Sequence, residues 1–323
     1  MMRGLVIGKF YPPHRGHKFL IETALAQVDH LDVLVCSRPE QTIPGDLRAR
    51  WLQEIHPAAD VRAIADPGED DNSKFWAEYT LRILGRAPDV VFTSEDYGEA
   101  YARFLGCRHV MVDRERKQVP ISGSVLRAAP LRYWEYLEPC VRAYFAKRVS
   151  VLGAESTGTT TLARELAEHY HTVCVPEYGR EYCEKMQIKG LDLWTYQWRT
   201  EEFAEIANRQ QDLEDHLARE ANRVLICDTD VLATGLWHER YLGIRSPEVE
   251  AIASSHRHDL YLLTDCDIPF VQDGLRDGET IREWMTARFE GTLTERELPW
   301  VKVSGDPTRR LTQAVEEIDK FLI

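Results

Sequence analysis

The chain lacks features that would place it in several common protein classes. Its seven cysteines form no C-x-x-C pair, and no apolar run approaches the roughly 18 residues needed to span a bilayer. The N-terminal segment does not have the form of a signal peptide. These absences exclude a disulfide-rich secreted fold and a membrane-spanning helix, and they predict buried free thiols in a cytoplasmic protein.

The sequence also lacks an excess of basic residues. Its 40 lysines and arginines compare with 53 aspartates and glutamates, which gives a formal net charge of -13. Duplex DNA and anionic membranes require a cationic footprint, so we expect no nucleic acid and no membrane as partner. Nucleotides need only local positive groups and are compatible with this charge. The oligomeric state stays open, a homo-oligomer included.

Short apolar runs alternate with helical patterns along all 323 residues, a length that favours two domains of ~150 residues each. Strands rich in Val, Ile and Leu, separated by helices, indicate parallel sheets covered on both faces. The pattern restarts near residue 147. We therefore predict an α/β protein with two doubly wound parallel-sheet domains, residues 1–146 and 147–323. The apolar runs are RGLVIGKF, HLDVLVCS, ADVRAIAD, DVVFTSED, RHVMVD, KRVSVLGA, HTVCVPEY, RVLICDTD, LYLLTD and WVKVSG.

The first apolar run leads directly into the string GKFYPPHRGHKFL at residues 8–20. His14 and His17 are three residues apart, with Gly16 between them. If a helix starts here, both imidazoles lie on one side of it, next to its unpaired backbone N–H groups. Imidazoles at a helix N-terminus predict a site for polyphosphate.

A second nucleotide motif follows the apolar run at residues 149–152. The string GAESTGTTT has the spacing of a P-loop, G-x-x-x-x-G-K-[ST], but Thr159 stands at the lysine position. The backbone N–H groups of such a loop form an anion nest that does not depend on the lysine. Thr160 stands where the Mg²⁺-binding hydroxyl belongs. The candidate nucleotide-binding residues of this loop are Gly153, Glu155, Ser156, Thr157, Gly158, Thr159, Thr160 and Thr161.

Acids at the end of a later apolar run support the same site. The string VLICDTD at residues 224–230 has the form of a Walker B segment. Asp228 and Asp230 are therefore candidates to reach Mg²⁺, directly or through water.

The N-terminal string resembles the signature of the nucleotidyltransferase superfamily, in which H-x-G-H follows the first strand. The superfamily's second signature, I-S-x-T-x-x-R, is matched by ISGSVLR at residues 121–127, with Ser124 at the position of the usual Thr. The chain most resembles NadR-type proteins, which join a nicotinamide-mononucleotide adenylyltransferase to a ribosylnicotinamide kinase, and Lys9 is typical of that branch. Some relatives also carry an N-terminal helix-turn-helix. Because the first strand begins within a few residues of Met1, we expect no such domain and no DNA-binding role.

The resemblance implies a Rossmann-like nucleotidyltransferase fold followed by a P-loop kinase fold, with ATP and Mg²⁺ as cofactors. It implies nicotinamide mononucleotide, nicotinamide riboside and NAD as substrates and products. In the N-terminal domain it assigns phosphate contacts to His14, His17, Lys9 and Arg127, and helix capping to Ser122. The further nucleotide-binding candidates are Gly8, Phe10, Gly16, Ser122 and Ser124. Trp76 is the candidate for the cationic nicotinamide ring, and Glu95 and Tyr97 could contact either the adenosine or the nicotinamide.

The resemblance also assigns residues of the C-terminal domain. The string VPEYGREY, at residues 175–182, supplies Glu177, Tyr178 and Arg180 near the riboside. The segment 267–282 resembles the family's lid and would bring Arg276 and Arg282 over the phosphates. The segment 304–310 could line the adenine pocket. Either Glu177 or an acid at 228–230 would orient or deprotonate the riboside hydroxyl.

The missing lysine leaves two interpretations of the second domain. An arginine at 180, 276 or 282 could supply the positive charge, so that the kinase is active. Alternatively, the protein is an adenylyltransferase whose second domain only binds nucleotide, as a sensor. Two further hypotheses are a nucleotidyltransferase for pantetheine phosphate joined to an unrelated P-loop module, and a regulatory protein that binds nucleotide without turnover.

Overall fold

The computed structural model describes residues 1–191, 195–255, 258–276 and 278–322. The chain divides into two compact units, Met1–Val141 (unit 1) and Arg142–Ile323 (unit 2). The division falls inside helix α6 (Pro139–Phe145), a few residues before the limit predicted after residue 146. All seven cysteines are free. Among the described helices, none is both long and apolar enough to cross a membrane.

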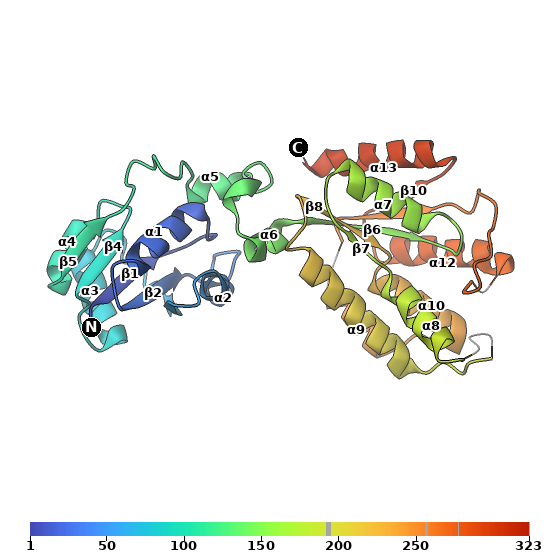
Figure 1. The fold of residues 1–323 in the computed structure, drawn as a ribbon, viewed down its shortest axis with the longest axis horizontal. Helices are drawn as coiled ribbons and strands as arrows, with labels where there is room; N and C mark the ends of the chain where they lie inside the picture. The colour runs from blue at the N-terminus through green and yellow to red at the C-terminus, as the bar shows by residue number, and fades with distance from the viewer. Residues whose placement is uncertain (192–194, 256–257, 277, 323) are drawn as a thin grey trace. The chain divides into compact units, whose positions relative to one another are not determined.

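All ten predicted strands are present, and each unit contains one five-stranded sheet (Figure 1). The strand order is β3-β2-β1-β4-β5 in unit 1 and β10-β9-β6-β8-β7 in unit 2, and neighbouring strands run parallel. The predicted pair of doubly wound sheets is therefore confirmed. The strands are β1 (Arg3–Gly8), β2 (His30–Ser37), β3 (Asp60–Ala65), β4 (Val90–Thr93), β5 (Arg108–Met111), β6 (Lys147–Gly153), β7 (Cys174–Val175), β8 (Val224–Asp228), β9 (Leu260–Thr264) and β10 (Trp300–Val303).

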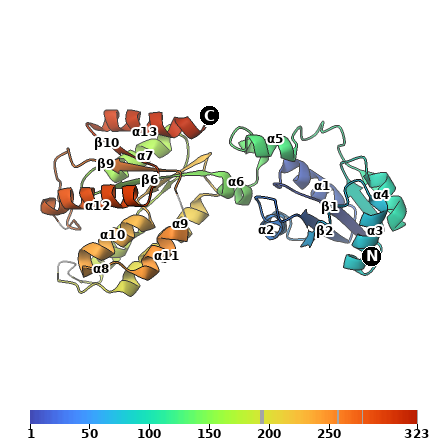
Figure 2. The ribbon, with the colours of Figure 1, turned by 180° about the vertical axis from the view of Figure 1, so that it is seen from behind.

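Helices lie on both faces of each sheet, as the two opposite views show (Figures 1 and 2). In unit 1, α1 and α2 cover one face and α3 and α4 the other; in unit 2, α7 and α13 cover one face and α10 and α12 the other. The helices are α1 (Arg15–Leu25), α2 (Gly45–Ile55), α3 (Ser73–Leu84), α4 (Gly98–Leu105), α5 (Gly123–Ala128), α7 (Thr159–His169), α8 (Tyr178–Ile188), α9 (Thr200–Leu217), α10 (Val231–Leu242), α11 (Pro247–Ser255), α12 (Arg282–Glu295) and α13 (Pro307–Leu322), with short 3₁₀ turns η1 (Trp134–Tyr136) and η2 (Glu279–Ile281).

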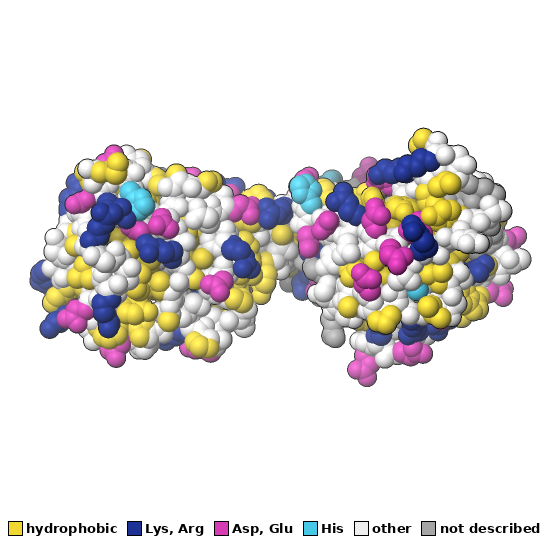
Figure 3. Space-filling view, turned by 90° about the horizontal axis from the view of Figure 1, so that it is seen from below, with side chains coloured by type: hydrophobic (Ala, Val, Ile, Leu, Met, Phe, Trp, Pro, Cys, Tyr) yellow, Lys and Arg dark blue, Asp and Glu magenta, His cyan; other side chains and the backbone are white. Residues whose placement is uncertain are grey.

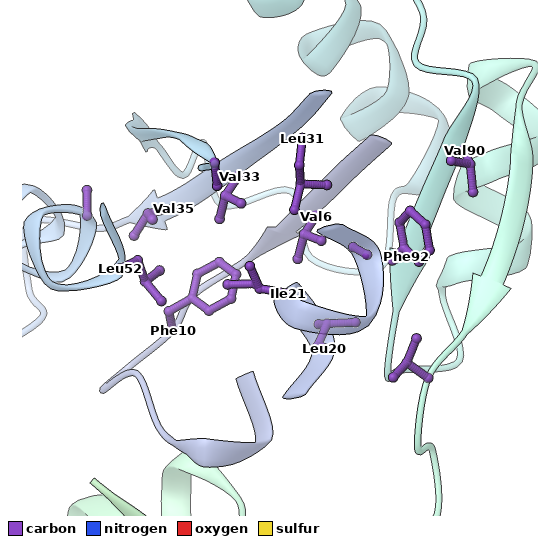
Figure 4. Packing of buried hydrophobic residues seen from close by; sticks show 14 residues of the cluster. Val6, Phe10, Leu20, Ile21, Leu31, Val33, Val35, Leu52, Val90 and Phe92 are labelled. Atoms are coloured by element: carbon purple, nitrogen blue, oxygen red, sulfur yellow. The ribbon is translucent and has the colours of Figure 1, made fainter. Parts of the chain in front are cut away.

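The alternation of side chains along the central strand β1 explains the two cores of unit 1. Val6 packs with Ile21 of α1, whereas its neighbour Leu5 packs on the opposite face with α3 and α4. Phe10, just beyond the strand, is 2% exposed and lies among Val6, Ile21 and Leu52 (Figure 4). Phe10 was predicted to bind nucleotide, and the structure shows that its ring also belongs to this core.

Strand β6 has the same central place in unit 2. Val151 faces α7 and α13, and the next residue, Leu152, faces α10 and α12. In both sheets the strands that follow the central strand in sequence lie on both sides of it. In unit 1, β2 and β3 lie on one side of β1, and β4 and β5 lie on the other; in unit 2, β7 and β8 lie on one side of β6, and β9 and β10 lie on the other. Such an arrangement opens a crevice at the carboxyl ends of the strands, where ligands of doubly wound folds bind. The two nucleotide motifs both begin at that point.

The last residue of β6 shows how tightly this turn is packed. A Cβ on Gly153 would lie 2.1 Å from the Thr264 hydroxyl and 2.5 Å from the Thr157 hydroxyl. These two hydroxyl oxygens are 2.7 Å apart, and each also lies within hydrogen-bonding distance of a backbone carbonyl, Thr157 at 2.6 Å from Ala154 and Thr264 at 3.1 Å from Leu152. A side chain at 153 would therefore break a buried hydrogen-bond network.

Gly153→Ala should destabilise unit 2 by about 1–3 kcal/mol, because the added methyl overpacks a site that cannot expand. Differential scanning calorimetry measures this as a lower melting temperature for the unit 2 transition. Gly291→Ala on α12 is the matched control, since a Cβ there meets no atom within 4 Å. Equal melting temperatures for the two variants would contradict the packing argument.

Candidate active sites

Unit 1 has a cleft of about 720 Å³ where β1 and β4 end. A smaller cavity of about 110 Å³ adjoins it, and His17 lines both. Every candidate site residue that was predicted for this domain lines one of these two cavities. Gly8, Lys9, Phe10, His17, Trp76, Glu95, Tyr97, Ser122, Ser124 and Arg127 line the cleft, and His14 and Gly16 line the small cavity.

The two predicted histidines begin helix α1. His14 is its N-cap, and its Nδ1 accepts a hydrogen bond of 3.1 Å from the Gly16 backbone N–H. The His17 ring stacks on His14 with a centroid separation of 3.7 Å, and the edge contact with Phe10 is 4.9 Å. The Nδ1 of His17 is buried and has no hydrogen-bond partner in the structure. A polar nitrogen left in this state beside a cleft is suited to meeting a ligand.

The electrostatics keep both imidazoles neutral. Burial, and secondarily the Arg116 guanidinium, lower the pKa of His14 to about 4. Burial, His14 and Arg116 hold the pKa of His17 well below its usual value. At neutral pH these rings therefore offer N–H groups as hydrogen-bond donors and carry no charge.

Positive charge in this site comes from longer side chains. The Arg127 guanidinium lies 4.5 Å from the Tyr11 ring centroid and donates to the Tyr11 carbonyl at 2.5 Å. Ser122 caps α5 through the Val125 backbone N–H, which confirms the predicted capping role. Lys9 reaches Asp70 at 4.0 Å.

Arg116 is a cation that the sequence reasoning missed. It lines both the cleft and the small cavity, and its Nη2 lies 3.0 Å from the Glu95 carboxylate. Its signal in the sequence was weak, because it belongs to the charged run DRERK at 113–117, in which several residues look alike. Only the fold turns Arg116 toward the histidines.

Two aromatic residues, Trp76 and Tyr97, also line the cleft. The Trp76 indole N–H donates to the Glu69 carbonyl at 2.8 Å, and its ring meets Tyr79 edge-on at 5.8 Å. Tyr97 donates to the Ile7 carbonyl at 3.1 Å. Trp76 is held at its polar end, so its ring has a defined position beside the cleft.

Unit 2 has a cleft of about 220 Å³ at the end of β6. It brings together most of the predicted residues of this domain: Gly153, Glu155, Ser156, Gly158, Thr159, Thr160, Thr161, Glu177, Arg180, Asp228 and Arg276. Four predicted residues are not among its described lining residues. These are Thr157, Tyr178, Asp230 and Arg282, all of which are buried.

The P-loop has the backbone that its sequence predicts. Gly158 adopts φ +82° immediately before α7, a conformation that favours glycine. Beneath the loop, Arg310 is 3% exposed, and its guanidinium donates to the Thr157 and Asp265 carbonyls and pairs with Asp267. Arg310 is the last residue of the segment 304–310, which was predicted to line the adenine pocket, and it holds the loop backbone.

The two Walker B candidates have different surroundings. Asp228 lines the cleft; burial raises the pKa of its carboxyl, and the nearby Thr160 and Thr159 hydroxyls act in the opposite direction. Asp230 is 3% exposed, accepts from the Ala233 N–H at 3.1 Å as the cap of α10, and lies 3.4 Å from His258. The paired oxygens of Thr160 and Asp228 suit Mg²⁺, which prefers oxygen ligands, whereas the Asp230 carboxylate is already engaged.

Glu177 lies at the start of α8, across the cleft from Asp228. Burial, and next the charge of Asp228, raise the pKa of Glu177 to about 7. The backbone at this point is held by Gln210, whose side-chain oxygen accepts from the Tyr178 N–H at 2.9 Å. Glu177 is therefore a carboxylate poised to exchange a proton near neutral pH. The Tyr178 ring itself packs against Lys185 and Arg209.

An aromatic wall that the sequence reasoning missed lines the same cleft. It consists of Trp198, Phe203, Trp237 and Tyr241. Trp198 lies 5.3 Å from Phe203 and 5.5 Å from Tyr241, between ring centroids. These residues come from the loop before α9, from α9 and from α10, so no local pattern joins them.

The segment predicted to be a lid is attached to the P-loop; Asp277 within it lies outside the described residues. The Val271 N–H donates to the Ser156 hydroxyl at 2.8 Å, and the Gly278 N–H donates to Glu155 at 3.2 Å. Arg282 is 5% exposed and donates to the Ile268 carbonyl at 2.9 Å. Arg282 therefore fastens the segment, and Arg276 is the predicted lid arginine that faces the cleft.

Basic and acidic side chains are interspersed on the face of each unit drawn in Figure 3. No broad basic surface appears there, in keeping with the net charge of -13. The positive groups relevant to an anionic ligand are those inside the two clefts.

Comparison with known proteins agrees with this division. A family model described as "AAA domain" matches residues 148–310. The "Trifunctional NAD biosynthesis/regulator protein NadR" of Escherichia coli K12 is 31% identical over 99% of this chain and 83% of its own length. The "Nicotinamide-nucleotide adenylyltransferase" of Thermococcus kodakarensis is 26% identical over 54% of this chain and 98% of its own. A solved structure, "Crystal structure of NadR protein in complex with NR", shares the fold with a TM-score of 0.81 at 20% identity, covering 99% of this chain and 96% of that one.

The fold, the histidine pair and the P-loop define a class of enzyme: a nucleotidyltransferase unit joined to a P-loop nucleotide-binding unit. Within this class, the chain belongs to the NadR family of NAD biosynthesis proteins.

The environment of His14 leads to a direct spectroscopic prediction. Its imidazole should remain neutral from pH 8 down to about pH 5 and gain a proton only near pH 4, because burial penalises the charged ring. Proton–carbon NMR of the His14 ring, assigned with a His14→Gln variant, measures this titration. A midpoint above pH 6 would contradict the buried, neutral state.

Proposed function

We propose that unit 1 transfers the adenylyl group of ATP to nicotinamide mononucleotide, which gives NAD and pyrophosphate. The observation that carries this proposal is the stacked pair of neutral histidines at the start of α1, at the edge of a cleft that also contains Lys9 and Arg127. A polyphosphate on this helix end meets unpaired backbone N–H groups, two imidazole donors and nearby cations. The similar adenylyltransferase supports the choice of substrate.

The reaction needs charge neutralisation more than proton transfer. A phosphate oxygen of the mononucleotide attacks the α-phosphorus, and the bond to the bridging oxygen breaks to release pyrophosphate. The attacking phosphate is already ionised at neutral pH, so no general base is required. His14 and His17 donate to phosphate oxygens, and Lys9, Arg116 and Arg127 stabilise the negative charge that develops on the leaving group. The neutral imidazoles orient the chain of phosphates without adding charge.

The nicotinamide ring is planar and cationic, so it favours an aromatic face. Trp76 lies on the cleft with its N–H already bonded to Glu69, which leaves the ring face for the ligand. Glu95 and Tyr97 line the cleft near the end of β4. We assign the mononucleotide to this side and the triphosphate to the histidine side.

His17→Ala should lower the rate of NAD formation from mononucleotide and Mg-ATP by about 100- to 1,000-fold, because a donor to the leaving group is lost. Chromatography of NAD and pyrophosphate measures the rate, with the exposed His216→Ala on α9 as control. Turnover of pantetheine phosphate in place of the mononucleotide by the unmodified protein would contradict the substrate assignment. Tight nucleotide binding without turnover would favour a regulatory protein.

We further propose that unit 2 phosphorylates nicotinamide riboside, the product of which is the substrate of unit 1. The observation that carries this proposal is a P-loop facing an aromatic wall across one small cleft. The P-loop suits the phosphates of ATP, and the rings of Trp198 and Tyr241 suit the cationic base of the riboside. The similar structure described as a complex with NR supports this choice.

Glu177 and Asp228 would have different roles in the phosphorylation step. The riboside 5′-hydroxyl oxygen attacks the γ-phosphorus, its proton passes to the Glu177 carboxylate, and the bond to the β–γ bridging oxygen breaks to release ADP. Asp228 and the Thr160 hydroxyl would hold Mg²⁺, which when bound neutralises charge on the phosphate oxygens. We favour Glu177 as the base, because Asp228 would hold Mg²⁺ and the Asp230 carboxylate caps α10 and lies beside His258.

Riboside phosphorylation should rise with pH through about 7 and level off above it, because Glu177 must be ionised to accept the proton and its pKa is raised to about 7. Glu177→Gln should lower turnover by about 100-fold or more and remove this rise. The formation of ADP and mononucleotide between pH 5.5 and about 8.5 measures both effects. The exposed Glu181→Gln on α8 is the matched control, and the same pH dependence in both variants would contradict the assignment.

A further inference from the structure

The cleft of unit 2 needs a source of positive charge that the P-loop itself does not supply. In a complete P-loop, the lysine reaches the β- and γ-phosphates. Here the Thr159 side chain is neutral and lies close enough to Asp228 to act on the pKa of that carboxyl. Its methyl group lies only 3.1 Å from where a Cβ on Gly153 would stand, so the side chain is directed at the floor of the loop. Thr159 therefore brings no positive charge to the phosphates.

The charged residues that line the cleft show which cations could replace the missing P-loop lysine. Three acids line it, namely Glu155, Glu177 and Asp228, and the two cations among its described lining residues are Arg180 and Arg276. A triphosphate would bring further negative charge to this acidic surrounding. These arginines are consequently the groups that can offset it without a rearrangement of the core.

Other nearby arginines are committed to holding the backbone. Arg282 is 5% exposed and donates to the Ile268 and Ser156 carbonyls. Arg310 is 3% exposed and bonds three carbonyls as well as Asp267. Turning either guanidinium toward a ligand would leave buried carbonyls unsatisfied, at a cost of about 1–3 kcal/mol each.

Arg180 and Arg276 converge on one carboxylate oxygen. Arg180 Nη2 lies 2.8 Å from Asp273 Oδ2, and Arg276 Nε lies 3.4 Å from the same atom. The Arg180 side chain is still 38% exposed, and its charge also acts on Glu177 and Asp228. Because the Val271 N–H is bonded to Ser156 of the P-loop, Asp273 is kept close to the loop.

We propose that Arg180 is the catalytic cation that replaces the P-loop lysine, and that Asp273 is a positioning residue that holds it over the loop until the triphosphate takes its place. Arg276 pairs with the same Asp273 carboxylate and also donates to the Val271 carbonyl. This inference rests on the proposed kinase function of unit 2. The replacement is possible because α8 begins beside the cleft, which places Arg180 about one helical turn after the base Glu177.

The test is a charge-removal and charge-return series in the full chain. Arg180→Met should lower the turnover of riboside phosphorylation by about 100- to 1,000-fold and leave NAD formation from mononucleotide unchanged, which serves as an internal control. Arg180→Lys should retain more activity than Arg180→Met. The double variant Thr159→Lys/Arg180→Met should phosphorylate riboside at least about tenfold faster than Arg180→Met, because the lysine returns a positive charge to the same phosphates. Lys185→Met, an exposed residue on the same helix, is the matched control.

Two results would overturn the assignment. One is an Arg180→Met protein that phosphorylates riboside as fast as the unmodified protein. The other is a slow Arg180→Met protein that Thr159→Lys does not rescue although its melting temperature is normal, since this pattern indicates a structural role.

A separate binding measurement distinguishes failure of the kinase proposal from failure of this inference. If the unmodified protein does not phosphorylate riboside, the proposed function of unit 2 is wrong. AMP-PNP binding is then measured by calorimetry in a His17→Ala background, which weakens the site in unit 1. About tenfold weaker binding in the Arg180→Met variant supports Arg180 as the phosphate cation, and equal binding overturns it.

Discussion

Both units depend on one constraint: a central parallel strand, covered on both faces, ends where a helix begins. Strands β1 and β6 are each paired with a neighbour on both sides, and the following turn and helix start offer backbone N–H groups that the sheet does not use. That turn must be compact, because helices pack closely on both sides of the strand. In unit 2 this compactness is visible at Gly153, where even one methyl group would collide with buried hydroxyls.

The two units use the same helix end with different chemistry. In the function we propose for unit 1, the donors include side chains, since neutral histidines stack at the start of α1 and longer cations lie around them. In unit 2 the donors are backbone groups of the P-loop, and the side-chain charge stands on α8 and on the lid segment. An acidic chain can therefore hold anionic ligands, because the positive groups are gathered inside the clefts.

The motifs with short sequence spacing were predicted well because their geometry is local. His14 and His17 are three residues apart and meet within one turn of α1, and the P-loop spans a single turn between β6 and α7. The positions of Arg116 and the aromatic wall were not predicted. Trp198 and Tyr241 are separated by more than one element of structure, and only the packing of α9 against α10 brings them to one cleft.

The sequence by itself determined the α/β class, the ten strands, the two phosphate-binding turns and the substitution of Thr159 for lysine. The tertiary structure decided which of several similar residues face the clefts. Asp228, Arg180 and Arg276 line the cleft of unit 2, whereas Asp230 and Arg282 are buried and are not among its described lining residues. The physical reason is that a periodic pattern specifies backbone and burial locally, whereas the direction of a long charged side chain depends on partners that come from distant parts of the chain.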